Sequence, residues 1–508
     1  MINQIDYFRK KIMTECGIPS DSNTRIVFET ILEELVPTML GKFITTKGIQ
    51  GKCGGKAYAL KFRFDKSFCQ LCSIFGVNNL VILEWKIIKY LPNIIICCAK
   101  YFATKPWKKD VSFVCNGVEI GDLLYDYIIR ITNRYTVSGR LSIQEKITIC
   151  KGVFIAVYCD KLFSQMHPTH FVSGELIYIS GIPARYAAKY GAKIICVTTG
   201  KRSFLYPKNI IGNNYKLTYV DLEHYVVQSD EIILMKSDWE KKVDQYFDNI
   251  HNGVGDWNIE KAYGNKINAE REEALKAIGI NNNKKNVLIL PHCFSDGSHG
   301  SSRMIFRDYY DWYENTLHII QSIKNVNWII KEHPCSGNYG EAGIAKNLFD
   351  EYSSKGIFFF PPEYSSEVVY KIADAIITVR GSAGMEAACK GIPVVLSGKA
   401  YYSDNGFTIE NKSMDEYCYV LNNLDKITPL SEEQINKAKK ILYKGLAFSE
   451  IVDDEYQIFC HDEYLPYLAD RPLNEFNTEE FLDKFISLIE SKPLKLSYWY
   501  KWGADCCE

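Results

Sequence analysis

Residues 380–384 have the composition of an anion-binding turn. Arg380, Gly381, Ser382, Ala383 and Gly384 follow a β-branched run and precede a segment of small residues. Glycines let the backbone approach a ligand closely, and serine adds a hydroxyl donor. Unpaired N–H groups at a helix start, together with the helix dipole, favour an anion there. The pattern indicates binding of a phosphate or phosphate ester, although such a turn, taken alone, more often serves packing.

The sequence around this turn predicts a strand, a helix and a second strand, which is half of a βαβ unit. A strand is expected at Ala375–Val379, a helix at Met385–Lys390 and a second strand at Pro393–Leu396. Glu386, near the start of that helix, is included among the candidate ligand contacts.

Two neighbouring strand ends carry further polar residues. A buried strand at 325–331 ends in Lys331, Glu332, His333 and Pro334. About thirty residues later Ser365 and Ser366 open a helix that either serine can cap. Histidine at a strand end more often makes a structural hydrogen bond, but parallel strand ends line one crevice, where ligands bind.

A third strand, at Asn286–Leu290, ends just before His292 and Asp296, with Arg303 and Arg307 further on. We expect His292 to face the same crevice. The two arginines suit a sugar carboxylate, because guanidinium binds carboxylate with paired hydrogen bonds; a solvated loop is an equal alternative.

Three phrases in this half resemble a known family: KEHP, then EYSSEVVYKIADAIITVRGSAGMEAACKGIPVV, then GKAYYSDNGFT. Over about 285–410 the chain is similar to bacterial capsule and surface-polysaccharide glycosyltransferases of GT-B fold, especially the Kdo (3-deoxy-manno-octulosonate) transferases and relatives that use CMP-activated sugars. The resemblance implies that His333-Pro334, Ser365-Ser366 and Ser382 hold the nucleotide of the donor. It does not fix the substrate.

The chain of 508 residues is long enough for two domains, and strands alternate with helices throughout. We therefore expect an α/β fold of two Rossmann-like domains, which in the GT-B arrangement face each other across a cleft. The expected divisions are 1–265, 266–460 and a C-terminal helix and aromatic tail at 461–508 that returns to the first domain. The resemblance implies that the first domain takes the acceptor and the second the nucleotide sugar.

Glycosyl transfer needs a carboxylate near the anomeric carbon, as a base, a nucleophile or a stabiliser of the transition state. The candidates are Asp122, Asp126 and Glu175, with Asp122 ranked first. Asp122 and Asp126 lie one helical turn apart and match a G-D-x-x-Y-D phrase of the resembling transferases. Each carboxylate has a structural alternative, which is to cap a helix or to pair with a cation such as Arg185.

The charge balance, the N-terminal sequence and the length of the apolar stretches indicate which classes of protein to expect. Lys and Arg number 60 and Asp and Glu 61, so nucleic-acid binding has no electrostatic support. The start, MINQIDYFRKK, is unlike a signal peptide, and the most apolar stretch, Leu80–Cys98, reads as strand and helix of a core. We expect a cytoplasmic protein. The tail Leu494–Trp502 mixes aromatics with lysines and can rest on the cytoplasmic face of the inner membrane, or strap across the other domain.

No metal and no cofactor is expected. Cys69–Cys72 lacks a second pair at zinc spacing, and Asp453-Asp454-Glu455 reads as a surface charge run. The expected function is transfer of a Kdo-like or other nonulosonic sugar from a CMP donor to an oligosaccharide or lipid-linked glycan. The alternatives are a hexose transferase using a UDP- or GDP-sugar, a polyol-phosphate transferase, and a non-catalytic nucleotide-sugar-binding assembly protein.

Overall fold

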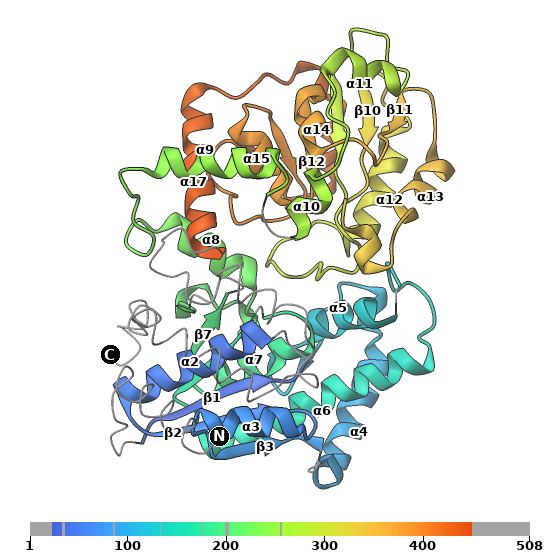
Figure 1. Ribbon diagram of the computed structural model, residues 1–508. Helices are drawn as coiled ribbons and strands as arrows, with labels where there is room; N and C mark the ends of the chain where they lie inside the picture. Colours follow the sequence, from blue (N-terminus) through green and yellow to red (C-terminus); the bar gives the residue numbers. More distant parts are fainter. Residues whose placement is uncertain are drawn as a thin grey trace. The chain divides into compact units, whose positions relative to one another are not determined.

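A computed structural model describes residues 23–32, 36–84, 87–132, 134–174, 176–198, 203–254 and 257–449 (Figure 1). These residues form two compact units. The first takes its described residues from 1–128, 140–222 and the chain after 446, and the second from 129–139 and 223–446. The main division thus falls at 222/223, earlier than the predicted 265/266. Helices between these points pack on the second unit, as the hydrogen bonds from Tyr246 and Tyr263 to Glu386 show.

The first unit is built on a six-stranded sheet in the order β3-β2-β1-β6-β7-β8. All neighbours are parallel except β7 and β8. The strand order reverses between β1 and β6, as in a Rossmann sheet. The strands are β1 (Arg25–Thr30), β2 (Lys56–Lys61), β3 (Asn79–Ile82), β6 (His170–Ser173), β7 (Lys193–Val197) and β8 (Ser203–Leu205); β4 (Val114–Cys115) and β5 (Val118–Glu119) form a separate ribbon.

Helices cover this sheet. Helix α2 packs on β1, β2, β6 and β7, α7 packs on β6 and β7, and α6 lies between α7 and α4. A capping box at Ser142 and Glu145 fixes the start of α6. The helices are α2 (Val36–Cys53), α3 (Lys66–Ile74), α4 (Ile87–Thr104), α5 (Gly121–Thr132), α6 (Ile143–Met166) and α7 (Gly181–Lys189).

The second unit has a fully parallel six-stranded sheet in the order β11-β10-β9-β12-β13-β14. Its switch point lies between β9 and β12, so the loops after these two strands open on the same crevice position. Strands buried on both faces explain the unbroken apolar runs in the sequence. The strands are β9 (Asn286–Ile289), β10 (Asn327–Ile330), β11 (Ile357–Phe359), β12 (Ala375–Thr378), β13 (Val394–Leu396) and β14 (Thr408–Glu410).

Side-chain caps set several helix starts in this unit. Asp308, Ser365 and Ser413 each accept a backbone N–H in the first turn of the following helix. The helices are α8 (Tyr219–Gln228), α9 (Trp239–His251), α10 (Trp257–Tyr263), α11 (Arg271–Ala277), α12 (Tyr309–Ile320), α13 (Ile344–Tyr352), α14 (Ser366–Ile372), α15 (Ser382–Cys389), α16 (Met414–Asn422) and α17 (Glu432–Ser449).

The α/β fold class with two Rossmann-like domains is confirmed, whereas two local expectations were wrong. The α15 helix begins at Ser382, three residues before the predicted start. The apolar stretch at 80–98 does contain β3 and α4, but one side of α4 is exposed rather than in a core.

No helix in the part of the chain that the structure describes is long and apolar enough to cross a membrane. The C-terminal helix and aromatic tail expected at 461–508 and the run Asp453-Asp454-Glu455 lie outside the described residues.

Candidate functional site

The turn from β12 to α15 presents two backbone donors at a helix start. Gly381 is the N-cap of α15, with φ −63° and ψ 149°, and no side chain caps the helix. Among the described residues no acceptor meets the N–H groups of Ser382 and Ala383, while the Gly384 N–H donates to the Gly381 carbonyl at 3.0 Å. Ser382 is exposed, so its hydroxyl is available beside them. This is the donor arrangement expected for an anion.

A hydrogen bond from Tyr402 holds the position of this turn. The Tyr402 hydroxyl donates to the Gly381 carbonyl at 2.6 Å. A Cβ at position 384 would overlap that hydroxyl and would come within 3.1 Å of the Val394 side chain. Gly384 is therefore required for close packing of α15 on β13 and Tyr402, and not for an unusual φ.

Gly384→Ala is expected to lower the free energy of unfolding by about 1–3 kcal/mol, the usual cost of overpacking a core. Urea denaturation measures this. Gly337→Ala is the matched control, because nothing lies within 4 Å of the added Cβ there. Adding Tyr402→Phe to Gly384→Ala removes the overlapping oxygen and should recover part of the loss. Equal effects at 337 and 384 would contradict the packing role.

His292, which follows β9, lies against the β12 turn across the switch point. Its Nε2 accepts the Arg380 N–H at 3.2 Å, and its ring stacks on Tyr309 with centroids 4.2 Å apart. Burial, then the Arg380 charge and His333, hold the pKa of His292 well below 6.5. The ring is thus neutral at pH 7, with its proton on Nδ1, and positions the turn by accepting a hydrogen bond.

Arg380 connects the turn to the loop after β9. Its Nη2 donates to the Gly297 carbonyl at 2.7 Å, and the guanidinium lies over Tyr309 at 5.3 Å. The other terminal nitrogen, Nη1, is buried and has no hydrogen-bond partner in the structure. The arginine therefore retains one donor for a ligand while it holds the loop.

His333, which follows β10, has one ring nitrogen engaged. Nδ1 accepts the Cys335 N–H at 3.2 Å and lies 3.2 Å from the Cys293 sulfur. Burial lowers the pKa of His333 to about 4, so this ring is also neutral at pH 7. With Nδ1 as acceptor the proton resides on Nε2, which makes no hydrogen bond to a described residue. Pro334 is exposed beside it.

Lys331, Ser365 and Ser366 form a second group at the ends of β10 and β11. The Lys331 ammonium donates to the Tyr364 carbonyl at 2.9 Å, and burial lowers its pKa to about 8. Ser365 caps α14 by accepting the Glu367 N–H at 3.2 Å, and Ser366 is the first residue of that helix. No hydrogen bond joins either serine to Ser382, so their shared role in nucleotide binding stays a prediction.

Glu386 is enclosed by three tyrosines. The hydroxyls of Tyr263, Tyr370 and Tyr246 donate to its carboxylate at 2.6, 2.7 and 3.2 Å. Burial raises the pKa of Glu386 above 4.5, and the tyrosine hydrogen bonds oppose that rise. The carboxylate joins α9, α10, α14 and α15, so its contacts are internal; binding of a donor by Glu386 stays a prediction.

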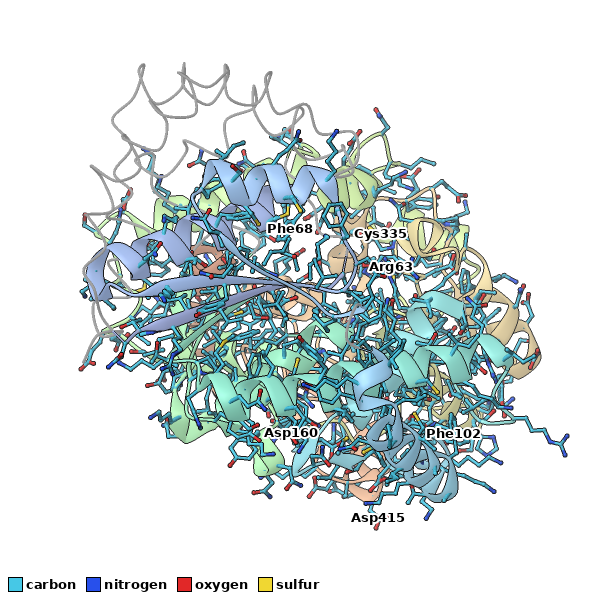
Figure 2. All side chains as sticks on the ribbon, turned by 90° about the horizontal axis from the view of Figure 1, so that it is seen from below. Arg63, Phe68, Phe102, Asp160, Cys335 and Asp415 are labelled. Atoms are coloured by element: carbon cyan, nitrogen blue, oxygen red, sulfur yellow. The ribbon has the colours of Figure 1, made fainter. Side chains whose placement is uncertain are left out.

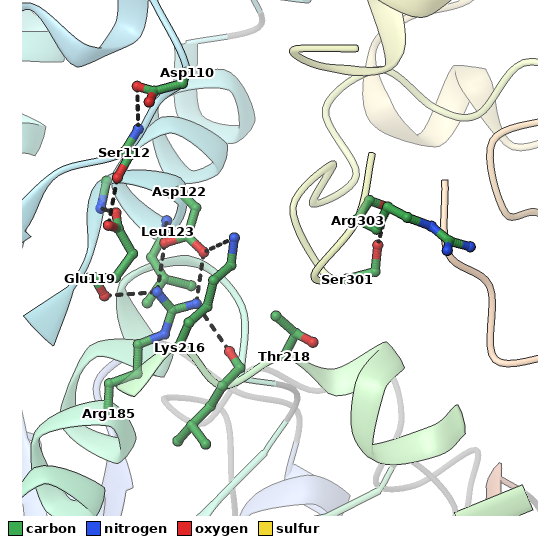
Figure 3. A network of polar contacts seen from close by, with 12 residues as sticks. Asp110, Ser112, Glu119, Asp122, Leu123, Arg185, Lys216, Thr218, Ser301 and Arg303 are labelled. Carbon is green, nitrogen blue, oxygen red and sulfur yellow. Dashed lines mark hydrogen bonds and ion pairs between the residues drawn. The ribbon is translucent and has the colours of Figure 1, made fainter. Parts of the chain in front are cut away.

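Asp122, in the first turn of α5, forms a buried ion pair in the first unit (Figure 3). Its two oxygens accept from Arg185 Nη1 and Nη2 at 2.6 and 2.8 Å, and Lys216 lies 3.5 Å away. Arg185 also donates to the carbonyls of Glu119 and Leu217. A carboxylate held on both oxygens by one guanidinium suits the structural alternative, and its catalytic assignment stays a prediction.

The other two carboxylate candidates are less defined. Asp126 is buried one turn after Asp122 on α5. Glu175 lies outside the described residues, two positions after Ser173, the last residue of β6.

A second buried ion pair lies at the switch point of the first unit and was not predicted from the sequence. Lys42 Nζ lies 2.7 Å from Glu29 Oε1, and both side chains are fully buried. Ser173, at the end of β6, donates to the same oxygen at 3.2 Å. The pair was not predicted because no local motif joins the two residues: Glu29 lies inside the apolar strand β1, and Lys42 lies inside α2, which has few charged residues.

Tyr309 and Tyr402 were not predicted as parts of the site. Tyr309 supports both His292 and Arg380, and Tyr402 holds the Gly381 carbonyl. Tyr402 belongs to the quoted phrase GKAYYSDNGFT, which was the available signal; Tyr309 is the first residue of α12 and had none.

The expected absence of a metal stays a prediction. Within the ranges that the structure describes, His, Cys, Asp and Glu side chains form no group of three or more that could hold a metal ion.

Comparison with known proteins identifies one family model. Residues 242–423 match the family of capsule polysaccharide biosynthesis proteins. No curated protein matches the chain.

Similar solved structures include the following three proteins. KpsC from Thermosulfurimonas dismutans, a beta Kdo 2,4 transferase, is 10% identical over 54% of this chain and 79% of its own, with TM-score 0.31. The UDP-GlcNAc 2-epimerase of Methanocaldococcus jannaschii is 12% identical over 84% and 99%, with TM-score 0.27. MnaA of S. aureus, solved with UDP, is 10% identical over 89% and 100%, with TM-score 0.28. Similarity this low does not show that this chain shares a substrate or a reaction with any of the three proteins.

The matched segment 242–423 contains every candidate of the second unit, from His292 to Glu386. Over this segment the chain is similar to capsule polysaccharide biosynthesis proteins.

Proposed function

We propose that this protein is a glycosyltransferase of surface-polysaccharide biosynthesis and that its second unit binds the nucleotide sugar. One observation carries the proposal. At the switch point of the parallel sheet, the turn after β12 carries the Ser382 and Ala383 N–H groups, which meet no acceptor among the described residues, and Arg380, whose Nη1 is buried and has no partner there. The segment that contains this arrangement matches the capsule polysaccharide family.

The charges at this position suit a leaving nucleotide phosphate. His292 and His333 are neutral at pH 7 because burial lowers their pKa values. The positive potential therefore comes from Arg380 and the start of α15. These donors are fixed before a ligand binds, since Tyr402 and His292 hold the turn. Preorganised donors stabilise the negative charge that develops when a sugar leaves its phosphate.

For the donor we propose a CMP-activated Kdo-like or other nonulosonic sugar, and for the acceptor a saccharide, free or lipid-linked. The support is the resemblance carried by His333-Pro334, Ser365-Ser366 and Ser382. Of the arginines expected to meet a sugar carboxylate, Arg303 pairs with Glu410 and Arg307 with Asp308 and Asp311. Those contacts are internal, so neither arginine adds support for a carboxylate-bearing sugar. A hexose transferase with a UDP- or GDP-sugar remains the second candidate.

Thermal unfolding with CMP, CDP, UMP, UDP and GDP side by side tests the nucleotide. A ligand at a hundredfold its dissociation constant adds ~2.7 kcal/mol to the free energy of unfolding. We expect stabilisation by CMP alone, and loss of that effect in His333→Ala. Stabilisation by UDP or GDP instead would favour the hexose donor. No response to any nucleotide would contradict the proposed site.

A further inference from the structure

Helix α4 (Ile87–Thr104) is apolar on nearly its whole circumference, yet only one side is in the core. Ile94, Cys97, Cys98 and Tyr101 are buried. On this side α4 packs against α6: Cys98 Sγ lies 3.5 Å from Cys150 Sγ, and Tyr90 contacts Tyr158 with ring centroids 5.6 Å apart. Phe102 of α4 and Asp160 of α6 are labelled in Figure 2.

The opposite side of α4 is apolar and exposed. Ile88, Leu91 and Ile95 repeat at i, i+3 and i+7, which places them on one face of the helix. Ile88 is 84% exposed and Ile95 59% exposed. Ile87 and Ile96 flank this row and are exposed as well. A row of unpartnered isoleucines is unusual on a water-facing helix and marks an interaction surface.

The first turns of α6 add exposed apolar side chains near the C-terminal end of α4. The contacts of Cys98 with Cys150 and of Tyr90 with Tyr158 pair the two helices in antiparallel order. The start of α6 therefore lies beside the end of α4, and Ile143 and Ile147 are exposed there. Of the fifteen large apolar side chains that are exposed among the described residues, these two helices carry seven.

The charged residues from the start of α4 to position 109 have one sign, and the exposed Asp110 follows them. Between positions 87 and 109 the chain has five lysines and neither aspartate nor glutamate. All five lysines are exposed, and none forms an ion pair with a described residue. Lys146 adds a further exposed cation between Ile143 and Ile147. The lysines in question are Lys89, Lys100, Lys105, Lys108 and Lys109.

We propose that the face formed by α4 and the start of α6 binds an anionic lipid surface, with α4 lying in the membrane interface. Isoleucines that enter the interface and lysines that meet acidic headgroups are the two components of such binding. A second copy of the chain fits less well, because a two-fold contact brings the same lysines of both copies together. The surface is defined within the first unit alone and does not depend on the proposed nucleotide site.

Flotation of the full chain with vesicles tests the proposal. One set is pure phosphatidylcholine and the other contains one-third phosphatidylglycerol. We expect binding to the acidic vesicles, weak binding to the neutral ones, and weakening with salt. The double change Ile88→Glu and Ile95→Glu should reduce binding more than about a hundredfold, because two isoleucines that would be buried in the membrane interface are lost. Each of Lys89→Gln and Lys100→Gln should reduce it about fivefold.

The control is Tyr419→Glu in α16, which is 71% exposed and lies on the second unit. It should bind vesicles like the unchanged protein, and all variants should keep the melting temperature because the changed side chains are exposed. Failure of the unchanged protein to bind acidic vesicles would overturn the proposal. Vesicle binding that survives the double isoleucine change but is lost in Trp499→Ser would also overturn it. A dimer in solution that the double isoleucine change dissociates would do the same.

Discussion

Arg185→Met is expected to lower the free energy of unfolding by about 3 kcal/mol, one of the two largest effects that the structure predicts. The change leaves the Asp122 carboxylate buried without its bidentate partner, and removing one member of a buried ion pair typically costs 3–5 kcal/mol. We expect the lower end because Lys216, 3.5 Å from Asp122, remains. Chemical denaturation followed by far-UV circular dichroism measures the change.

The matched control replaces both partners, as Asp122→Leu with Arg185→Met. Two apolar residues leave no uncompensated charge, so this double variant should recover most of the lost stability. It also separates the two roles of Asp122. If the double variant folds and keeps transferase turnover, the pair is structural. If it folds but turnover falls by orders of magnitude, the catalytic assignment of Asp122 is supported. A single Arg185→Met variant with unchanged stability would contradict the buried pair.

Ser382→Pro is expected to weaken nucleotide binding about 10- to 150-fold while the fold is kept. The reason is that proline removes one N–H donor at the first position of α15, and a hydrogen bond to a charged group contributes roughly 1.5–3 kcal/mol. Proline is tolerated there, since the first helical N–H has no intrahelical partner. Gly381, with φ −63° and ψ 149°, already has the conformation that a residue before proline prefers. Titration calorimetry measures the affinity.

Ser382→Ala is the control for this experiment, because it removes the hydroxyl and keeps the N–H. A larger loss in the proline variant than in the alanine variant assigns binding to the backbone donor. Equal losses would assign it to the hydroxyl. Unchanged affinity in the proline variant, with an unchanged melting temperature, would contradict anion binding at the start of α15.

Much of the second unit was predictable because its strands are buried on both faces. Such strands read as unbroken runs of Ile, Val and Leu, and β9, β10, β12 and β13 all lie where these runs were found. The residues that begin two of the helices were also recognisable from the local sequence. The serine before α14 and the glycines after β12 indicated that a helix follows each, although α15 begins at Ser382 and not at Met385. Helix boundaries depend on hydrogen bonds that periodicity does not reveal.

Contacts between distant positions were not predictable in this way. Tyr309 beneath His292, and Tyr402 behind Gly381, come from elements that only the sheet order brings to the β12 turn. Asp122 was ranked as catalytic from its place at a helix start. The structure shows a guanidinium on both of its oxygens, and its catalytic assignment stays a prediction. Pairing with Arg185 was only one alternative from the sequence, because Arg185 is 63 residues away.

By itself, then, the sequence determined the fold class and the position of the glycine turn between β12 and α15, since both follow from the order of nearby residues. Only the tertiary structure decided which polar groups remain available. In the structure Glu386 accepts hydrogen bonds from three tyrosines and Asp122 pairs with Arg185. The Ser382 and Ala383 N–H groups meet no acceptor among the residues that the structure describes. The tertiary structure also left one side of α4 exposed, where the apolar sequence alone predicted a core helix. The physical reason is that hydrophobic periodicity records how apolar a side chain is, whereas burial and pairing depend on which distant elements pack against it.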